Sequence, residues 1–319
     1  MSPRLRYVVR RLLLTVPVLV AMSVFVFLII RLVPGDPVRT MLGFRATDAN
    51  VAQVRSQLGL DDSLIVQYGR FAGGLLHGDL GTDFVSRAPL SGLLSQRLPV
   101  TLELTLLSMG LAILVGVPLG VLAATGSRRV RRLIDGFVIA GVSIPDFWLG
   151  IMLVLLFSAS LAVLPPSGYV PFGEDPAANL QYMILPVLTL ATAEAAYILR
   201  TTRGAMESVM GQPFISFLRA KGVRRRDIVY RHALRNAAAP VITVIGIQFG
   251  VLLGGAIVIE TLFAFPGVGR LLVTAINQRN YPVVQAGVLA VALLFILVSL
   301  VTDLAIGWID PRVVDGKGS

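Results

Sequence analysis

The chain has 319 residues, of which 55% are hydrophobic and 14% charged, and its formal net charge is +10. This apolar fraction is too large for the core of one soluble domain, so it predicts an integral membrane protein. The chain has no cysteine and only two histidines, which argues against disulfides and metal clusters. Its arginines lie beside apolar segments, so the positive charge is explained by the orientation of the chain in the membrane and by contact with anionic lipid. This argues against nucleic acid as a partner.

Six segments are apolar and long enough to cross a membrane as helices. We predict spans at residues 12–30, 102–126, 135–164, 181–200, 237–259 and 282–303. The first follows a basic head, but its apolar run is too long for a signal peptide and no cleavage pattern follows Ile30. The predicted fold class is therefore an all-α integral membrane protein with six transmembrane helices.

Arginines cluster before the first span, after the second and after the fourth, so these three regions are predicted to be cytosolic. Both termini, residues 1–11 and 313–319, then lie in the cytosol. Residues 31–97 form a long extracytoplasmic loop, in which Val51, Val54 and Leu58 predict a small helical cap.

Three acidic residues lie within or near the spans, namely Asp146, Glu194 and Asp303. Ionisable residues inside a membrane are candidates for function, so a proton-driven carrier is an alternative that these residues keep open. Each also has a structural explanation: Asp146 follows Pro145 and would cap a helix that restarts after a break, Glu194 would pair with Arg200, and Asp303 lies near the cytosolic end of its span.

Residues 201–236, here called the basic segment, connect the fourth and fifth spans. Pro213 suits a first helical position, Phe214, Phe217 and Leu218 are spaced to form one apolar face, and Gly222 predicts a left-handed stop. A second basic helix begins near Arg224. The residues alone allow two interpretations: a helix that docks another protein, or an amphipathic helix at the membrane surface.

The turn after the fifth span contains Glu260, Phe263 and the pair Pro266-Gly267. It predicts either a gate folded over the outer mouth of a path or a rigid turn.

In the fifth span, Gly246, Gly250 and Gly254 form a smooth stripe, suited either to a seam with another subunit or to packing within this one. In the second span, Gly116 and Gly120 flank Pro118 and are candidate hinges to which no site is assigned.

The chain contains no glycine-rich phosphate-binding loop ending in Lys-Ser or Lys-Thr, and its only lysines are Lys221 and Lys317. Any nucleotide-derived energy must therefore come from another protein.

Several motifs in chain order resemble those of the dipeptide and oligopeptide permease family of ABC importers, and the likeness extends over nearly the whole chain. They are Pro34-Gly35-Asp36-Pro37, Gly78-Asp79-Leu80-Gly81, Leu98-Pro99-Val100-Thr101-Leu102-Glu103-Leu104, Leu218-Arg219-Ala220-Lys221-Gly222 with His232-Ala233-Leu234-Arg235-Asn236 and Pro240, Glu260 to Gly269, and Asp310-Pro311-Arg312. The chain is most similar to the first (B-type) of the two permease subunits. It departs from the pattern at Thr82-Asp83, where a serine is often nearby, and at Ile306, where an aromatic residue is common.

This resemblance implies a type I importer permease domain over residues 98–312 that is not itself an enzyme. The implied partners are a second permease subunit, two cytosolic ATPases that hold ATP and magnesium, and an extracytoplasmic substrate-binding protein; this chain would bind no cofactor or metal. The implied substrates are di- or oligopeptides, with nickel complexes or glutathione as alternatives. The residues expected to contact an ATPase are Phe214, Phe217, Leu218, Arg219, Ala220, Lys221, Gly222 and Arg224. Candidate path or gate residues are Asp146, Glu260, Phe263, Pro266 and Gly267.

Overall fold

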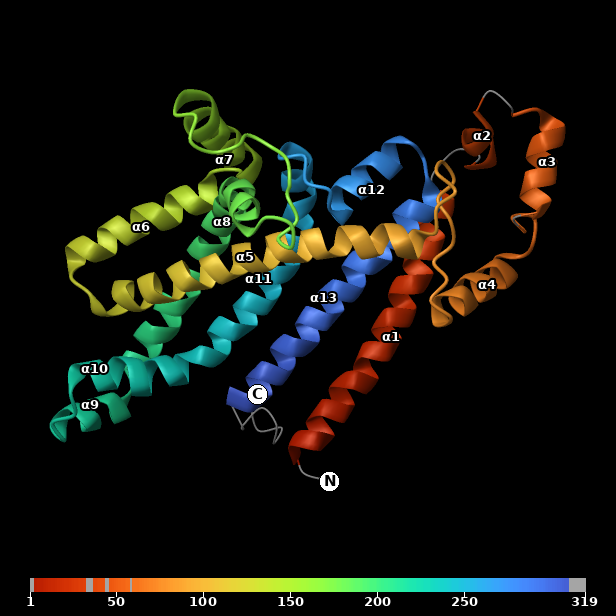
Figure 1. Cartoon of the computed structure of the whole chain (residues 1–319). Coiled ribbons are helices and arrows are strands. Elements are labelled where there is room, and N and C mark those ends of the chain that lie inside the picture. Colours follow the sequence, from red (N-terminus) through yellow and green to blue (C-terminus); the bar gives the residue numbers. More distant parts are fainter. Residues whose placement is uncertain (1–2, 33–36, 44–45, 58, 310–319) are drawn as a thin grey trace. The chain divides into compact units, whose positions relative to one another are not determined.

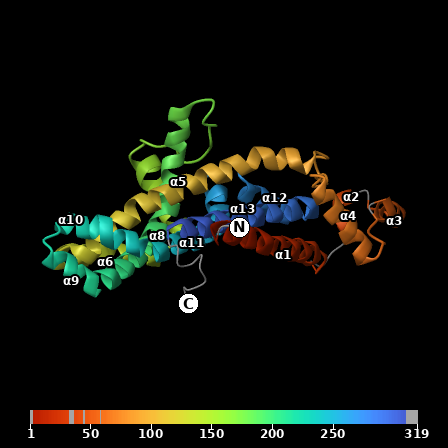
Figure 2. The same ribbon diagram turned by 90° about the horizontal axis from the view of Figure 1, so that it is seen from below.

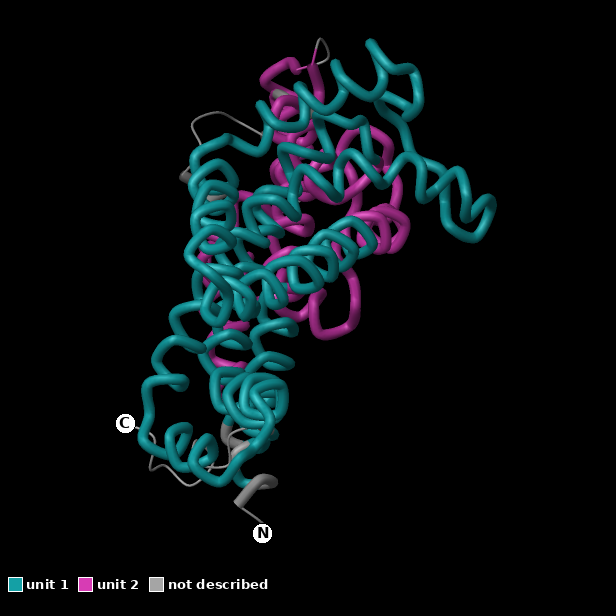
Figure 3. Tube along the Cα trace, turned by 90° about the vertical axis from the view of Figure 1, so that its left-hand side faces the viewer, with its two compact units in different colours: residues 1–12, 102–265, 295–319 teal, residues 13–101, 266–294 magenta. Residues whose placement is uncertain are grey.

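The computed structural model describes residues 3–32, 37–43, 46–57 and 59–309. Within these ranges the secondary structure is helical, apart from one isolated bridge between Thr82 and Pro89. The prediction of an all-α fold is thus confirmed. The chain divides into two compact units, one made of residues 1–12, 102–265 and 295–319, the other of residues 13–101 and 266–294 (Figure 3).

Five helices in the described part of the chain are long and apolar enough to cross a membrane. They are α1 (Pro3–Leu32), α5 (Leu90–Thr125), α8 (Pro176–Met210), α11 (Leu234–Leu262) and α13 (Tyr281–Ile309), labelled in Figure 1. Each extends beyond the apolar run that predicted it. The extension is largest in α5, which begins 12 residues before the predicted boundary, and in α8, which continues ten residues into the basic segment.

The third predicted span, residues 135–164, is not one helix. The structure places α6 (Arg128–Ser143), then α7 (Asp146–Leu153) running into the π-helical η2 (Val154–Ser160), with a bend of 103° between the two parts. Pro145 causes the break, because a proline restricts the preceding residue to extended backbone, and Ile144 has φ −85° and ψ 121°. The break expected beside Pro145 is confirmed, but Asp146 does not cap the second helix: Pro145 is the N-cap residue and Asp146 is the first helical residue, with no side-chain capping hydrogen bond.

The long loop after α1 is helical, as predicted. It contains α2 (Pro37–Leu42), α3 (Asp48–Gln57) and α4 (Leu64–Leu76). Tyr68 of α4 packs edge-on against Phe27 of α1, with ring centroids 5.3 Å apart, and its hydroxyl lies 2.8 Å from that of Ser23. This aromatic contact holds α4 against the end of α1. Of the motif Pro34-Gly35-Asp36-Pro37 only Pro37 lies within the described residues, and Asp310-Pro311-Arg312 lies outside them.

The motif Gly78-Asp79-Leu80-Gly81 is a pair of tight turns at the end of α4. Gly78 has φ +75°, and the N–H of Asp79 reaches back to the carbonyl of Gly74 at 2.9 Å, which ends the helix in a left-handed stop. Gly81 has φ +85°, and its N–H donates to the Asp79 carboxylate at 2.8 Å. Glycine is favoured at both positions because other residues are strained at positive φ.

Asp83 closes the loop that follows. Its carboxylate accepts hydrogen bonds from the Val85 N–H at 2.8 Å, the Ser86 hydroxyl at 2.5 Å and the amide of Asn280, which precedes α13. Burial raises the pKa of Asp83, but these hydrogen bonds outweigh it, so the pKa lies below the ordinary value of 3.8.

This pKa shift predicts a pH dependence of stability. A carboxylate with a lowered folded-state pKa stabilises the fold above its unfolded pKa, and that contribution is lost as the pH falls below about 3.8 through the folded value. We expect Asp83→Asn to lower the thermal unfolding midpoint at pH 6, and the gap between variant and wild type to shrink as the pH falls below 3.8. A gap that stays constant over this range would contradict the assignment.

The helix α12 (Val268–Asn277) follows the turn after the fifth span and is not among the predicted helices. Its buried residues Val268, Leu272 and Ala275 pack with Leu90 and other apolar side chains of α5 and α13. The Val268 N–H donates to the Thr101 hydroxyl at 2.9 Å, which satisfies one of the free donors at the start of α12.

In the first unit, α8 packs against α6, α7 and α11. The helix α5 also lies close to α8 at Gly116 and Gly120, where a Cβ atom would come within 2.8 Å of the backbone oxygens of Ala195 and Leu199. The two glycines therefore allow close helix packing.

The glycine stripe of α11 also packs within the subunit at two of its three positions. A Cβ on Gly246 would meet Thr302 at 2.4 Å, and one on Gly250 would meet Phe295 at 2.3 Å, both in α13. A Cβ on Gly254 would meet nothing within 4 Å. Of the two interpretations left open by the sequence, packing within the subunit accounts for Gly246 and Gly250.

Candidate functional site

The middle of the basic segment folds into a short helix, α9 (Pro213–Ala220), between α8 and α11. Pro213 occupies its first turn, where a missing N–H costs nothing. Gly222 has φ +75°; its N–H bonds to the Arg219 carbonyl at 2.9 Å, and the N–H of Val223 bonds to that of Leu218 at 3.1 Å. This pair of bonds is the Schellman motif, so the predicted left-handed stop at Gly222 is confirmed.

The apolar face predicted for α9 divides between the interior and the surface. Ile215 is fully buried, Phe214 and Leu218 are half-buried beside it, and Phe217 is 58% exposed. Phe217 packs instead against its own turn, with the Lys221 ammonium 4.5 Å from the ring centroid. Because α9 has only two turns, the spacing of Phe214, Phe217 and Leu218 predicted an apolar arc but not which edge of it points inward.

Ile215 belongs to a buried cluster that joins α9 to the ends of three long helices. The other buried members come from α5, α8, η3 and α11 and are Val121, Met206, Val209, Ile228, Val229, Ala233 and Ala237. Figures 1 and 2 both show α9 and α10 (Arg225–Asp227) together at the ends of α8 and α11. A displacement of α9 therefore acts on α5, α8 and α11 through packed side chains.

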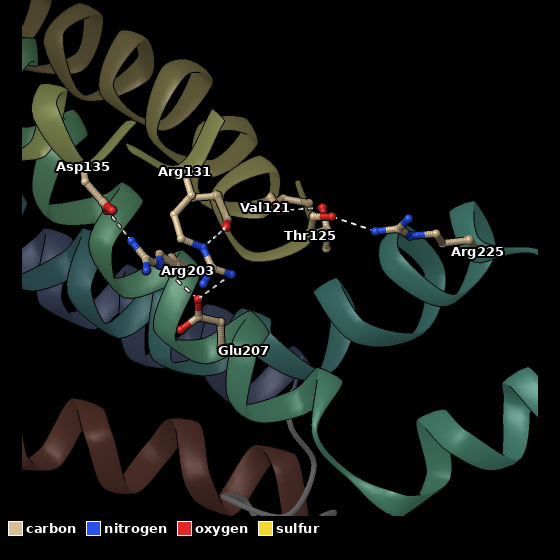
Figure 4. Close-up of polar contacts among 8 residues, drawn as sticks. Val121, Thr125, Arg131, Asp135, Arg203, Glu207 and Arg225 are labelled. Atoms are coloured by element: carbon tan, nitrogen blue, oxygen red, sulfur yellow. Dashed lines mark hydrogen bonds and ion pairs between the residues drawn. The ribbon is translucent and has the colours of Figure 1, made fainter. Parts of the chain in front are cut away.

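After Gly222 the chain returns to the long helices without a further break. The helix α10 leads through the π-helical turn η3 (Ile228–Ala233) into α11, giving one helical stretch from Arg225 to Leu262. At its start, the Arg225 guanidinium donates to the carbonyl of Thr125 at the end of α5, at 2.6 Å (Figure 4). Of the other residues expected to contact an ATPase, Arg219, Ala220, Lys221 and Arg224 are exposed or half-exposed.

A network of ion pairs lies beside this region and was not predicted. Figure 4 shows Arg203 of α8 between Asp135 of α6 and Glu207, with Arg203 Nε 3.0 Å from Glu207. Arg131 of α6 reaches Glu207 at 3.4 Å and the Ala123 carbonyl of α5 at 3.2 Å. The spacing of Arg203 and Glu207 by four residues was a local signal, but the partners on α6 are distant in sequence.

A groove of about 660 Å³ opens next to the network, between α6 and α8. It is lined by Asp135, Val138, Ile139, Leu199, Arg200, Arg203, Gly204 and Glu207. The ion pairs thus form one wall of a mixed polar and apolar groove.

At the other end of the first unit, the turn containing the candidate gate residues is tightly packed. Glu260, Phe263 and Phe265 are fully buried. The Gly168 N–H donates to the Phe263 carbonyl at 2.9 Å, and the Tyr169 ring packs on Phe265 with centroids 5.4 Å apart. These contacts join the turn to the loop after η2.

Tyr169 also connects this turn to α5. Its hydroxyl donates to Glu103 at 2.7 Å, and burial together with this carboxylate raises the pKa of Tyr169 well above its ordinary range. Pro266 and Gly267 belong to the second unit, where Gly267 is buried and caps α12.

Ala264 ends α11 in the left-handed conformation that glycine usually supplies. Its φ is +58°, and the flanking bonds from Phe265 to Glu260 at 2.8 Å and from Ala264 to Thr261 at 3.4 Å form a second Schellman motif. We expect Ala264→Gly to stabilise the protein by about 1 kcal/mol, because an alanine is strained there. Ala239→Gly, inside the same helix, should lower the thermal unfolding midpoint instead; a lowered midpoint for both would contradict the prediction.

The acids in the spans have the following surroundings. Asp146 is half-buried in the first turn of α7. Glu194 accepts a hydrogen bond from Gln248 of α11 at 2.8 Å, so its predicted pairing with Arg200 is wrong. Asp303 pairs with Arg11 at 2.8 Å. Among the residues that the structure describes, no group of three or more histidine or acidic side chains is arranged to hold a metal.

The structure has long apolar helices that can span a membrane and a short helix, α9, packed against the ends of α5, α8 and α11. This is the architecture of a membrane transport permease. The chain belongs to the family of binding-protein-dependent transport system inner membrane components: the family profile matches residues 116–315, and that of its N-terminal part matches residues 4–105. It is a permease subunit of an ABC importer, a multi-pass inner membrane component that works with an ATPase and a binding protein.

Two curated relatives match almost end to end. A glutathione transport system permease protein, GsiC, of Salmonella paratyphi A is 44% identical over 310 residues, which are 97% of this chain and 99% of the relative. A protein of Sinorhizobium fredii named as a probable peptide ABC transporter permease protein, y4tP, is 40% identical over 96% of this chain and 98% of its own length.

A solved structure of the MetNI methionine ABC transporter in an inward-facing conformation has a similar fold. It aligns with a TM-score of 0.57 at 18% identity, covering 68% of this chain and 96% of the solved chain. At this identity the likeness bears on the fold alone.

Proposed function

We propose that this chain carries short peptides into the cell, and that the basic segment couples this movement to ATP hydrolysis on partner subunits. The observation that carries the coupling role is the position of α9, whose buried Ile215 lies in one cluster with the ends of α5, α8 and α11. The exposed side of α9, with Phe217 and Lys221, is left to contact an ATPase. Such a helix acts as a lever, because whatever grips it moves the spans to which it is packed.

The proposed substrate class is based on the substrates for which the two relatives are named. One is named for glutathione, which is itself a short peptide, and the other for peptides. Glutathione is therefore the alternative substrate that the comparisons favour, and nickel complexes remain the further alternative from the family resemblance. The partners in this proposal are a second permease subunit, two ATPases that bind ATP and magnesium, and an extracytoplasmic binding protein. Both termini and the arginine-rich ends of α5 and α8 face the cytosol.

Purification from the native membrane tests this proposal. We expect two ATPases and a second permease to accompany the chain, and reconstituted vesicles to accumulate labelled peptide only with ATP and the binding protein. The bound ligand of the co-purified binding protein identifies the substrate as a peptide, glutathione or a nickel complex. Uptake by this chain alone, driven by a proton gradient without ATP, would overturn the proposal in favour of a secondary carrier.

A further inference from the structure

The two long helices α8 and α11, which lead into and out of the region of α9, are joined to each other far from α9. The helices α8 and α11 pack along one another. Glu194 of α8 accepts a hydrogen bond from the Gln248 side-chain amide of α11 at 2.8 Å. Glu194 lies 16 residues before the end of α8, and Gln248 lies 14 residues after the start of α11. At 1.5 Å per residue the bond is about 24 Å along α8 from its last residue and about 21 Å along α11 from its first.

This hydrogen bond is buried inside the first unit. Glu194 is 6% exposed and Gln248 is 9% exposed. Among the residues that the structure describes, none forms a salt bridge with Glu194, so Gln248 is its polar partner there. A buried polar group that loses its partner in such surroundings is costly, and this makes separation of the two helices unfavourable.

We infer that Glu194 and Gln248 are positioning residues that hold α8 and α11 together as one body, so that a displacement of α9 moves both helices in the same direction. Without the bond, α9 would still pull on both helices at the arginine-rich end, but their distant halves would separate and part of the motion would be lost. This inference rests on the coupling role proposed for α9.

Four variants separate the positioning role of the Glu194–Gln248 hydrogen bond from a role of the Glu194 charge. Glu194→Gln keeps an oxygen that can accept the Gln248 amide proton, but it can carry no charge. Glu194→Leu and Gln248→Leu each leave one buried polar group without a partner. The double variant Glu194→Leu/Gln248→Leu removes both polar groups and replaces them with an apolar pair, which suits a membrane interior and favours correct insertion.

The distance between the helices can be measured directly because the chain has no cysteine. Leu188 of α8 and Val258 of α11 are 37% and 51% exposed and lie beyond the bond as seen from the basic segment. A side chain at Gly255 would touch Leu190 at 3.6 Å, so the two helices are adjacent at this level. Leu188→Cys and Val258→Cys, spin-labelled in the assembled transporter, report the separation by electron paramagnetic resonance with and without ATP.

We expect wild type and Glu194→Gln to keep one narrow distance distribution with and without ATP, and to transport equally well. In the double leucine variant the distribution should broaden on ATP binding, and substrate transported per ATP hydrolysed should fall about fivefold or more, while ATP hydrolysis itself continues. If the double variant does not assemble, Gln248→Met removes the same hydrogen bond with a side chain of similar length, and we expect the same broadening and the same fall in transport per ATP.

Two results would overturn the inference. One is a double variant with an unchanged distance distribution and normal transport per ATP. The other is a Glu194→Gln variant that keeps the distance but loses transport, since Glu194 would then act through its charge or proton. Failure of the coupling role of α9 is distinguished by Gly222→Val, which alters α9 and leaves the bond between α8 and α11 in place.

Discussion

Replacing Gly222 with valine is expected to reduce transport strongly while the chain still inserts and assembles. At φ +75° an L-residue is strained by about 1–2 kcal/mol, and a β-branched one by more. A Cβ there would meet nothing within 4 Å, so the effect comes from the backbone and not from a clash. A shift of this size changes the population of the correct helix stop about five- to thirtyfold, and peptide uptake should fall by a similar factor.

Two matched substitutions isolate the backbone effect. Gly222→Asn should retain most of the uptake, because asparagine tolerates the left-handed region. Gly211→Ala lies at the other end of α9, at φ −84° and with contacts no closer than 3.6 Å, and should transport normally. Normal uptake by Gly222→Val, measured in vesicles with equal amounts of assembled transporter, would remove the reason for assigning the coupling role to α9.

Replacing Gly120 with leucine is expected to have the largest effect on stability. A Cβ at this position would lie 2.5 Å from Thr202 Cβ and 2.8 Å from the Leu199 backbone oxygen, and a backbone atom cannot turn aside as a side chain can. The helices α5 and α8 must therefore separate. Overpacking of this kind costs about 1–3 kcal/mol, and more where the backbone has to move.

The control for this prediction lies on the same helix. Gly110 is exposed, and a Cβ there would meet nothing within 4 Å. Gly110→Leu should therefore unfold at the wild-type temperature in detergent, whereas Gly120→Leu should unfold well below it or fail to accumulate. Equal unfolding midpoints for the two variants would show that α5 does not approach α8 through Gly120.

Features that depend on composition or on local backbone geometry could be predicted from the sequence. The long apolar runs predicted an all-α membrane protein, and the glycine after Lys221 predicted where α9 ends, since a left-handed stop requires little beyond its own residue. The break before Asp146 was visible for the same reason, because proline acts on its immediate neighbour.

Features that depend on partners distant in the chain could not be predicted. Glu194 pairs with Gln248, 54 residues away, although Arg200 was the nearest basic residue in sequence. Arg203 meets Asp135 across 68 residues. The inward position of Ile215 likewise depends on side chains from three other helices, which the periodicity of an eight-residue helix does not reveal.

The π-helical turn η3 determines where the helical stretch from Arg225 to Leu262 can change its length by one residue among relatives. In a π turn, hydrogen bonds span five residues where an α turn spans four, so the turn accommodates one additional residue while the helices on either side keep their orientation. A chain one residue shorter within Ile228–Ala233 would close into plain α-helix and leave Ile215 facing the same cluster. A deletion in α10 or early α11 would instead rotate one side of the helix against the other by about 100°. Single-residue gaps in this part of the family should therefore be found at η3.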